Sequence, residues 1–184
     1  MENNNKILVI GPSGSGKTYI SSELKKKGVN AVDADLVAGL SGWFNNQGNK
    51  VAYPEDADKV FLDTHEFLWN KEFLKQFLSK QKEIYLFGLS GNVFSVMDLF
   101  DSVYFLDVKL NVIRKNLRHE SRNNPMGKTD YQLENALKYA EEIKQKAKEL
   151  GIIFIDATSK TPQQIFKEIE KISNITWDDI KKAL

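Results

Sequence analysis

The stretch at residues 6–18, KILVIGPSGSGKT, constrains the fold of this chain more than any other part of its sequence. A short apolar run at residues 7–10 leads into the pattern G-x-x-x-x-G-K-[ST], which is typical of a loop that binds nucleotide phosphates. We expect a strand before this loop and a helix after it, because β-branched residues precede the loop and helical spacing follows it. The alternative is a glycine turn that binds nothing, but such a turn needs no lysine and threonine in register.

Each residue of this loop has an expected role in a site for ATP and Mg²⁺. Backbone N–H groups crowd around phosphate oxygens in such a loop. The predicted binding residues of the loop are Gly11, Pro12, Ser13, Gly14, Ser15 and Gly16. Lys17 supplies a positive charge for the β and γ phosphates. The hydroxyl of Thr18 is the predicted ligand of Mg²⁺.

Two carboxylates lie at the end of the second predicted strand, which spans residues 30–36. Asp33 and Asp35 come where this strand should end, and open α/β sheets bind their ligands at the carboxyl ends of strands. One carboxylate can hold Mg²⁺ through water, and the other can accept a proton from an attacking hydroxyl. A turn or helix cap is the alternative interpretation, because aspartate favours both.

The three arginines of the chain fall on one line of a helix predicted over residues 110–123, at Arg114, Arg118 and Arg122. Residues four apart on a helix share one face. Guanidinium suits bidentate phosphate contact and the stabilisation of a transferring phosphoryl group. The alternative is an exposed face without a ligand, although lysine fills that role elsewhere in this sequence.

A long segment at residues 36–81 is the predicted acceptor-binding part of the chain. We expect residues 37–52 to be irregular and residues 54–78 to form helices that meet near Asn70. Aromatic side chains in this segment either contact a ligand or belong to the core or surface, and they are Trp43, Phe44 and Trp69, with His65 beside them. The turn-rich residues 119–130 are the predicted lid, where Lys128 is a weaker candidate for a phosphate contact.

Composition limits the classes of function. The 184 residues carry a net charge of +1 and no cysteine, which does not favour nucleic acid as a partner and fits a reducing cytoplasm. We expect a cytoplasmic protein with no membrane segment and no signal peptide. Asp107 can be read as a Walker B aspartate, but Val108 follows it where many ATP-hydrolysing motors place glutamate, so we do not expect a motor.

The order of elements predicts a single α/β domain over residues 1–184. Short strands separated by helices indicate a parallel sheet in three layers. After residues 6–10 and 30–36, the further strands are expected at residues 83–88, 102–108 and 152–155. Helices are expected at residues 17–27, 130–150, 161–172 and 173–184.

Residues 6 to about 172 resemble the small P-loop kinases: adenylate kinase, shikimate kinase and gluconate kinase. The resemblance rests on the phosphate loop, the Asp33–Asp35 pair, the glycine that ends the strand at residues 83–88, the arginine helix and the turn after residue 155. It implies a five-stranded parallel sheet in the order 2-3-1-4-5, and transfer of the ATP γ-phosphate to a small molecule.

The same resemblance implies roles for individual residues. Asp33 resembles the aspartate that binds Mg²⁺ through water, and Asp35 resembles the base that binds the acceptor. Arg118 resembles the arginine that lies over adenine, and Arg122 resembles the lid arginine that meets the phosphates. The turn that begins with Asp156 and Thr158 resembles the loop that contacts adenine.

One departure from the family concerns the acceptor. No arginine lies between Leu36 and Gln81, where nucleoside monophosphate kinases and shikimate kinase use arginine to hold an anionic acceptor. Either the lid arginines hold the acceptor, or the acceptor is uncharged where it meets this segment. In the second case a hydroxyl acceptor such as a nucleoside or sugar-like compound fits better than a monophosphate. The alternatives are a nucleoside monophosphate kinase, an ATPase or assembly factor that needs no acceptor, and a 5′-hydroxyl polynucleotide kinase.

Overall fold

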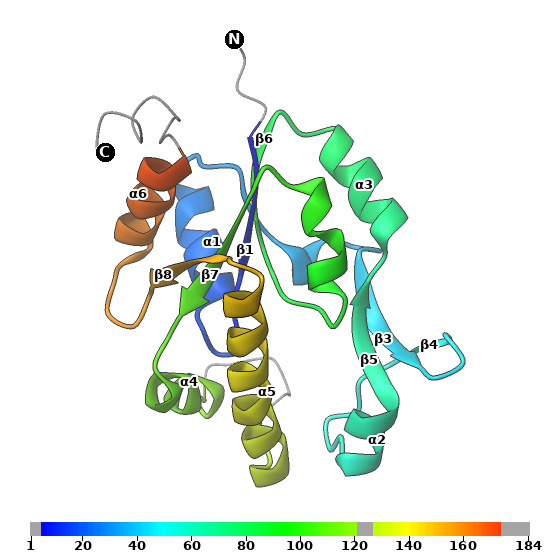
Figure 1. Cartoon of the computed structure of the whole chain (residues 1–184). Helices are drawn as coiled ribbons and strands as arrows, with labels where there is room; N and C mark the ends of the chain where they lie inside the picture. The colour runs from blue at the N-terminus through cyan, green and yellow to red at the C-terminus, as the bar shows by residue number, and fades with distance from the viewer. Residues whose placement is uncertain (1–4, 121–126, 174–184) are drawn as a thin grey trace.

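The computed structural model describes residues 5–120 and 127–173, and it contains a large parallel sheet and a small antiparallel sheet (Figure 1). The large sheet has five strands in the order β2-β6-β1-β7-β8. Their bounds are Asn5–Ile10 for β1, Ala31–Asp33 for β2, Glu83–Phe87 for β6, Ser102–Asp107 for β7 and Ile153–Asp156 for β8. All neighbouring pairs are parallel, so the predicted fold and strand order are confirmed.

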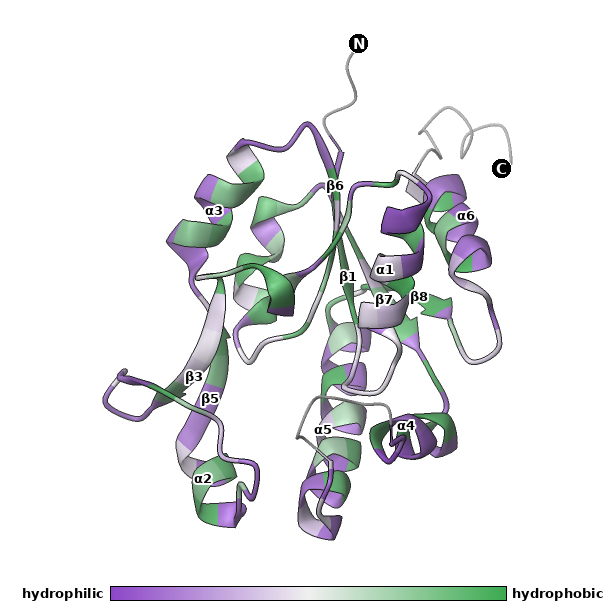
Figure 2. Cartoon of the chain, turned by 180° about the vertical axis from the view of Figure 1, so that it is seen from behind, coloured by the Kyte–Doolittle hydropathy of each residue, from purple (hydrophilic) through white to green (hydrophobic). Residues whose placement is uncertain are grey.

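Helices cover both faces of this sheet because its central strand is apolar on both sides. In β1, Ile7 and Val9 pack in one cluster with α1 (Lys17–Lys26) and α6 (Pro162–Ser173). Leu8 and Ile10 pack in the other cluster, with α3 (Lys71–Ser79), the 3-10 helix η2 (Val93–Leu99) and α5 (Asp130–Glu149). Figure 2 shows the hydrophobic colouring along these central strands, with hydrophilic residues toward the outside of the helices.

The helix that carries the arginines is shorter than predicted. We expect it over residues 110–123, but α4 spans Leu110–Leu117 and Arg118 is its C-cap. Ile113 and Leu117 are buried against α5, and residues 118–120 are Arg, His and Glu, with no apolar side chain to continue that packing. Residues 121–126, which are half of the predicted lid and include residue 122, lie outside the described residues, as do residues 174–184 of the helix predicted at residues 173–184.

The largest correction concerns residues 37–69, which form a small sheet and one short helix instead of an irregular loop and a longer helix. The second predicted helix, which follows Asn70, is present as α3. The order of its strands is β4-β3-β5, and they span Lys50–Val51, Ser41–Asn45 and His65–Trp69. The helix expected from residue 54 to near Asn70 is reduced to the short α2 (Lys59–Thr64), and β5 takes the apolar residues that follow it.

Local chemistry explains why this segment forms strands. The side-chain oxygen of Asn45 accepts hydrogen bonds from the backbone N–H of Gln47 at 3.0 Å and of Asn49 at 2.9 Å, which closes the turn between β3 and β4. Trp43 of β3 lies opposite Phe67 of β5, with ring centroids 5.7 Å apart. Cross-strand aromatic pairs of this kind stabilise antiparallel strands.

The two sheets are joined by the loop that follows β6. The side chain of Asn92 accepts the backbone N–H of Trp69 at 3.0 Å and donates to its carbonyl at 2.9 Å. The N–H of Gly91 donates to the carbonyl of Phe67 at 2.7 Å. Trp69 is buried against Gly88, so the core packs closely on this glycine.

We predict that Gly88→Ala destabilises the protein by roughly 1–3 kcal/mol, because the added methyl group overpacks this joint. A Cβ at Gly88 would lie 2.5 Å from Cζ2 of Trp69 and 2.7 Å from Cβ of Ala34. Denaturant unfolding measures the change. The same substitution in a Trp69→Phe background should lose less stability, and equal losses in both backgrounds would contradict the predicted overlap with the indole.

Candidate functional site

The phosphate loop connects β1 to α1 and has the backbone geometry of an anion site. Gly14 and Gly16 have φ angles of 83° and 91°, in the region that favours glycine. Gly16 is the N-cap of α1, so the positive end of that helix faces the loop. The Lys17 ammonium donates to the carbonyls of Gly11 at 2.7 Å and Pro12 at 2.9 Å, which holds its charge over the loop.

Helix α4 supports this loop from its outer side. The side chain of Asn116 donates to the carbonyl of Gly14 at 2.8 Å. A Cβ at Gly14 would lie 3.1 Å from the carbonyl oxygen of Ile113 and 3.1 Å from Leu117. The sequence analysis does not single out Asn116, because its role depends on a contact between residues 102 positions apart.

The two aspartates lie at the end of β2, where the chain turns into the 3-10 helix η1 (Ala34–Leu36). Asp33 is buried, and its carboxylate accepts the backbone N–H of Asp35 at 3.0 Å. Asp33 is therefore the cap of η1, and Asp35 lines a cavity beside Lys17. The two interpretations that the sequence leaves open are compatible, since one aspartate caps and the other faces the cavity.

The environment of Asp35 favours its protonated form more than water does. Loss of solvent around the carboxyl raises the pKa of Asp35 above its ordinary value of 3.8, and repulsion from Asp33 raises it further. The ammonium of Lys17 acts in the opposite direction. A carboxylate with a raised pKa is a better proton acceptor once it is ionised.

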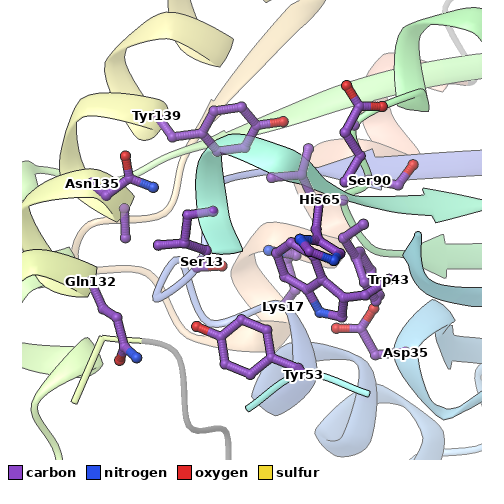
Figure 3. Close-up of a pocket in the computed structure, with 16 residues that line it drawn as sticks. Ser13, Lys17, Asp35, Trp43, Tyr53, His65, Ser90, Gln132, Asn135 and Tyr139 are labelled. Atoms are coloured by element: carbon purple, nitrogen blue, oxygen red, sulfur yellow. The ribbon is translucent and has the colours of Figure 1, made fainter. Parts of the chain in front are cut away.

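A cavity of about 610 Å³ opens between the phosphate loop, the small sheet and α5 (Figure 3). Ser13, Lys17 and Asp35 line it from the large sheet. The other labelled residues come from the small sheet, the β6 loop and α5, and they are Trp43, Tyr53, His65, Ser90, Gln132, Asn135 and Tyr139. The volume is within the range that small-molecule sites occupy.

The small sheet and its flanking segments supply an aromatic wall to this cavity. Trp43 lies 4.9 Å from Tyr53 and 5.5 Å from Phe61 between ring centroids. His65 stacks on Phe61 at 4.1 Å, and its Nδ1 lies 3.0 Å from the carbonyl of that residue. His65 and Trp43 therefore face the cavity, whereas Trp69, four residues beyond His65, belongs to the core.

Gln132 of α5 ties the two sides of the cavity together. Its Oε1 accepts the backbone N–H groups of Lys128 at 3.1 Å and Thr129 at 3.3 Å, in the capping box that begins α5. Its Nε2 donates to the carbonyls of Glu55 and Ala57, each at 3.2 Å. One buried amide thus joins the start of α5 to the segment between β4 and α2.

The described arginines do not line the cavity. Arg118 donates to the carbonyl of Lys128 and to the carboxylate of Asp130, and Arg114 pairs with Glu134 at 2.8 Å. Both contacts place these guanidinium groups between α4 and the start of α5. Their predicted contacts with nucleotide stay predictions, as does that of Arg122, which lies outside the described residues.

The remaining predicted residues lie around the carboxyl ends of β7 and β8. The carboxylate of Asp156 accepts the backbone N–H of Thr158 at 2.9 Å, and this hydrogen bond lowers the pKa of Asp156. Thr158 in turn accepts the N–H of Lys109 at the start of α4. The carboxylate of Asp107 forms an ion pair with the ammonium of Lys144 at 2.5 Å, which links the end of β7 to α5.

Two residues could supply oxygen ligands to a magnesium ion. Thr18 is exposed in the first turn of α1, and Asp33 keeps one carboxylate oxygen outside its cap hydrogen bond. Within residues 5–120 and 127–173, no cluster of three or more histidine, aspartate or glutamate side chains could hold a metal. These residues fit Mg²⁺ that is bound together with phosphates and water, as this ion usually is in nucleotide sites.

The match to a protein family decides the classification of the chain. The family model described as an AAA domain matches residues 7–153, which include the phosphate loop, the Asp33–Asp35 pair and all but the last strand and helix. The chain belongs to this AAA domain family. The match spans every described element that lines the cavity of this AAA domain.

Solved structures share the fold of this AAA domain at low sequence identity. Shikimate kinase from Acinetobacter baumannii is 15% identical, with a TM-score of 0.61 over 93% of this chain and 94% of its own. Shikimate kinase from Bacteroides thetaiotaomicron is 14% identical, with a TM-score of 0.55 over 93% and 99%. Deoxyadenosine kinase from M. mycoides is 15% identical, with a TM-score of 0.51 over 92% and 100%. The fold is therefore that of the P-loop small-molecule kinases.

One curated relative carries a name that refers to nucleotides. A protein from Thermosipho africanus (strain TCF52B), named "Nucleotide-binding protein", is 26% identical over 171 residues, which are 91% of this chain. The match covers 54% of that protein, so this chain spans about half the length of the relative.

None of the helices in the described part of this AAA domain is long and apolar enough to cross a membrane.

We predict that Gln132→Glu destabilises the protein by roughly 1–3 kcal/mol. Glutamate keeps the oxygen that accepts from Lys128 and Thr129 but loses the Nε2 donor, and it places a negative charge against the carbonyls of Glu55 and Ala57. Thermal unfolding measures the loss of stability. Hydrogen exchange should accelerate at residues 54–58.

The matched control is Gln145→Glu, which adds the same charge on an exposed position of α5. It should change stability by no more than about 0.5 kcal/mol. If both variants lose the same stability, the hydrogen bonds from Gln132 to the carbonyls of Glu55 and Ala57 do not contribute to holding α5 against the segment between β4 and α2.

Proposed function

We propose that this protein is an ATP- and Mg²⁺-dependent kinase that transfers the γ-phosphate to a hydroxyl of a small molecule, such as a nucleoside or a sugar-like compound. The observation that carries this proposal is the cavity itself. Its lining includes Ser13 and Lys17 of the phosphate loop, the carboxylate of Asp35 and an aromatic wall. A phosphate donor and an acceptor of modest size therefore have room side by side.

The proposed chemistry is a single displacement at the γ-phosphorus. Asp35 orients the acceptor hydroxyl and takes its proton, the acceptor oxygen forms a bond to phosphorus, and the bond from phosphorus to the β-γ bridging oxygen breaks. ADP leaves with that oxygen. Lys17 and either Arg118 or Arg122 neutralise the charge that develops on the phosphoryl oxygens.

Mg²⁺ would be held by Thr18 and Asp33 and would neutralise phosphate charge when it is bound. We assign the adenine contacts to Arg118 and to the turn at Asp156 and Thr158, which adjoin the two ends of α4. In this proposal, residues 1–184 form one kinase domain, with the acceptor segment at residues 36–81 and the lid at residues 119–130.

A second candidate is an ATPase or assembly factor of the same fold that needs no acceptor. We keep this second candidate because the name of the Thermosipho africanus relative states nucleotide binding and no transfer. A nucleoside monophosphate kinase and a polynucleotide kinase are less well supported. The side chains that line the cavity include no arginine, and Lys17 is their one lysine within the described residues.

Product formation separates these functions. The protein is incubated with γ-labelled ATP, Mg²⁺ and a panel of nucleosides, nucleoside monophosphates, sugars and oligonucleotides. The proposal expects labelled product with nucleosides or sugar-like alcohols. Release of phosphate at a rate that no acceptor changes would overturn the kinase assignment and support the ATPase.

We predict that Asp35→Asn lowers kcat for phosphoryl transfer by about 100- to 10,000-fold, because the amide cannot accept the proton of the hydroxyl. ATP binding, followed by calorimetry, should be unchanged, since Asp35 lies on the acceptor side of Lys17 in the proposed arrangement. Asp63→Asn, at an exposed residue that does not line the cavity, is the control and should keep full activity. Undiminished transfer by Asp35→Asn would remove this residue from the mechanism.

A further inference from the structure

The acceptor side of the cavity carries negative charge. Among the described residues that line it, the acidic side chains are Asp35 and Glu66, and the basic side chain besides His65 is Lys17. Lys17 belongs to the phosphate loop, where it contacts the carbonyls of Gly11 and Pro12. The wall opposite the loop therefore has a carboxylate and no lysine or arginine to neutralise it.

Glu66 is placed to contact a ligand in the cavity. It lies on β5, between His65 and Phe67, and all three residues line the cavity. Its carboxylate has no ion pair or hydrogen bond with the residues that the structure describes. A carboxylate accepts hydrogen bonds only, so an N–H group is its natural partner in a ligand.

Helix α5 supplies the facing side of this part of the cavity. Asn135 and Tyr139 lie one turn apart on the same face of α5, and both line the cavity. Burial raises the pKa of Tyr139, and the carboxylates of Glu142 and Glu66 raise it further. Glu66 is thus close enough to Tyr139 to act on it across the cavity, and Tyr139 stays a neutral phenol.

The wall beside Glu66 suits a flat or cationic group. The ring centroid of Trp43 lies 4.9 Å from that of Tyr53 and 5.7 Å from that of Phe67. Aromatic faces stack on planar ligands and attract cations. An anionic acceptor would meet this wall and two carboxylates, and the one lysine among the described lining residues, Lys17, belongs to the phosphate loop.

We propose that the acceptor carries an amino group that donates to Glu66, presents a flat or cationic body to the Trp43 wall and has no anionic group. This inference rests on the proposed kinase function and specifies its substrate class. The amine has two chemical sources, the exocyclic amino group of a nucleobase or an aliphatic ammonium group. Asp35 then meets the hydroxyl at one end of the ligand, and Glu66 meets the amine.

Matched pairs of ligands test the proposal. Adenosine is compared with inosine and cytidine with uridine, since each pair differs in an exocyclic amino group. Ethanolamine, whose ammonium group carries N–H donors, is compared with 1-propanol, its uncharged analogue, and AMP is the anionic probe. Both transfer from ATP and binding by calorimetry are measured, so binding is scored even for a ligand that is not phosphorylated.

The expected result is a preference of about 10- to 100-fold for the aminated member of at least one pair, in binding and in kcat/KM, with AMP weaker than adenosine. Glu66→Gln should reduce this preference to near unity. Glu142→Gln is the control, because Glu142 also acts on Tyr139 but does not line the cavity, and it should keep the preference.

The outcomes separate this inference from the proposed function. Equal binding of both members of every pair, tighter binding of AMP than of adenosine, or an unchanged preference in Glu66→Gln overturns the inference, even if transfer occurs. A preference in binding that Glu66→Gln removes, without transfer to any acceptor, supports the inference and overturns the kinase assignment.

Discussion

The side chain of Asn92 determines how the small sheet is oriented toward the nucleotide site. It makes two hydrogen bonds to the backbone of Trp69, as a neighbouring strand would, and it does so from the loop that follows β6. That loop begins beside the end of β1, where the N–H of Gly88 donates to the carbonyl of Val9 at 3.1 Å. The phosphate loop and the aromatic wall are therefore positioned by the same few residues.

The features that the sequence predicts correctly depend on local patterns. The phosphate loop, α1 and the five parallel strands each follow from residues that are close together in the chain, such as the apolar run before Gly11. The aspartates at the end of β2 are found because parallel strands present their carboxyl ends to the ligand. Their catalytic roles are not tested by the geometry and stay predictions.

The features that the sequence analysis misses depend on contacts between distant segments. The residues of β5 have apolar spacing that also fits a helix, and their pairing with Ser41–Asn45 decides the outcome. Gln132 and Asn116 act through bonds to Ala57 and Gly14, which no pattern in their own neighbourhoods indicates. Glu66 looks like an ordinary exposed residue until β5 places it opposite Tyr139.

The separate positions of two tryptophans have a practical consequence. Trp43 lines the cavity, while Trp69 is only 2% exposed and packs on Gly88. Indole fluorescence shifts with the polarity and the quenching groups around the ring, so a molecule that enters the cavity changes the emission of Trp43 and leaves that of Trp69 nearly constant. Within the described residues, Trp43 is thus an intrinsic optical probe of cavity occupancy, and Trp69 on the neighbouring strand of the same sheet is its internal reference.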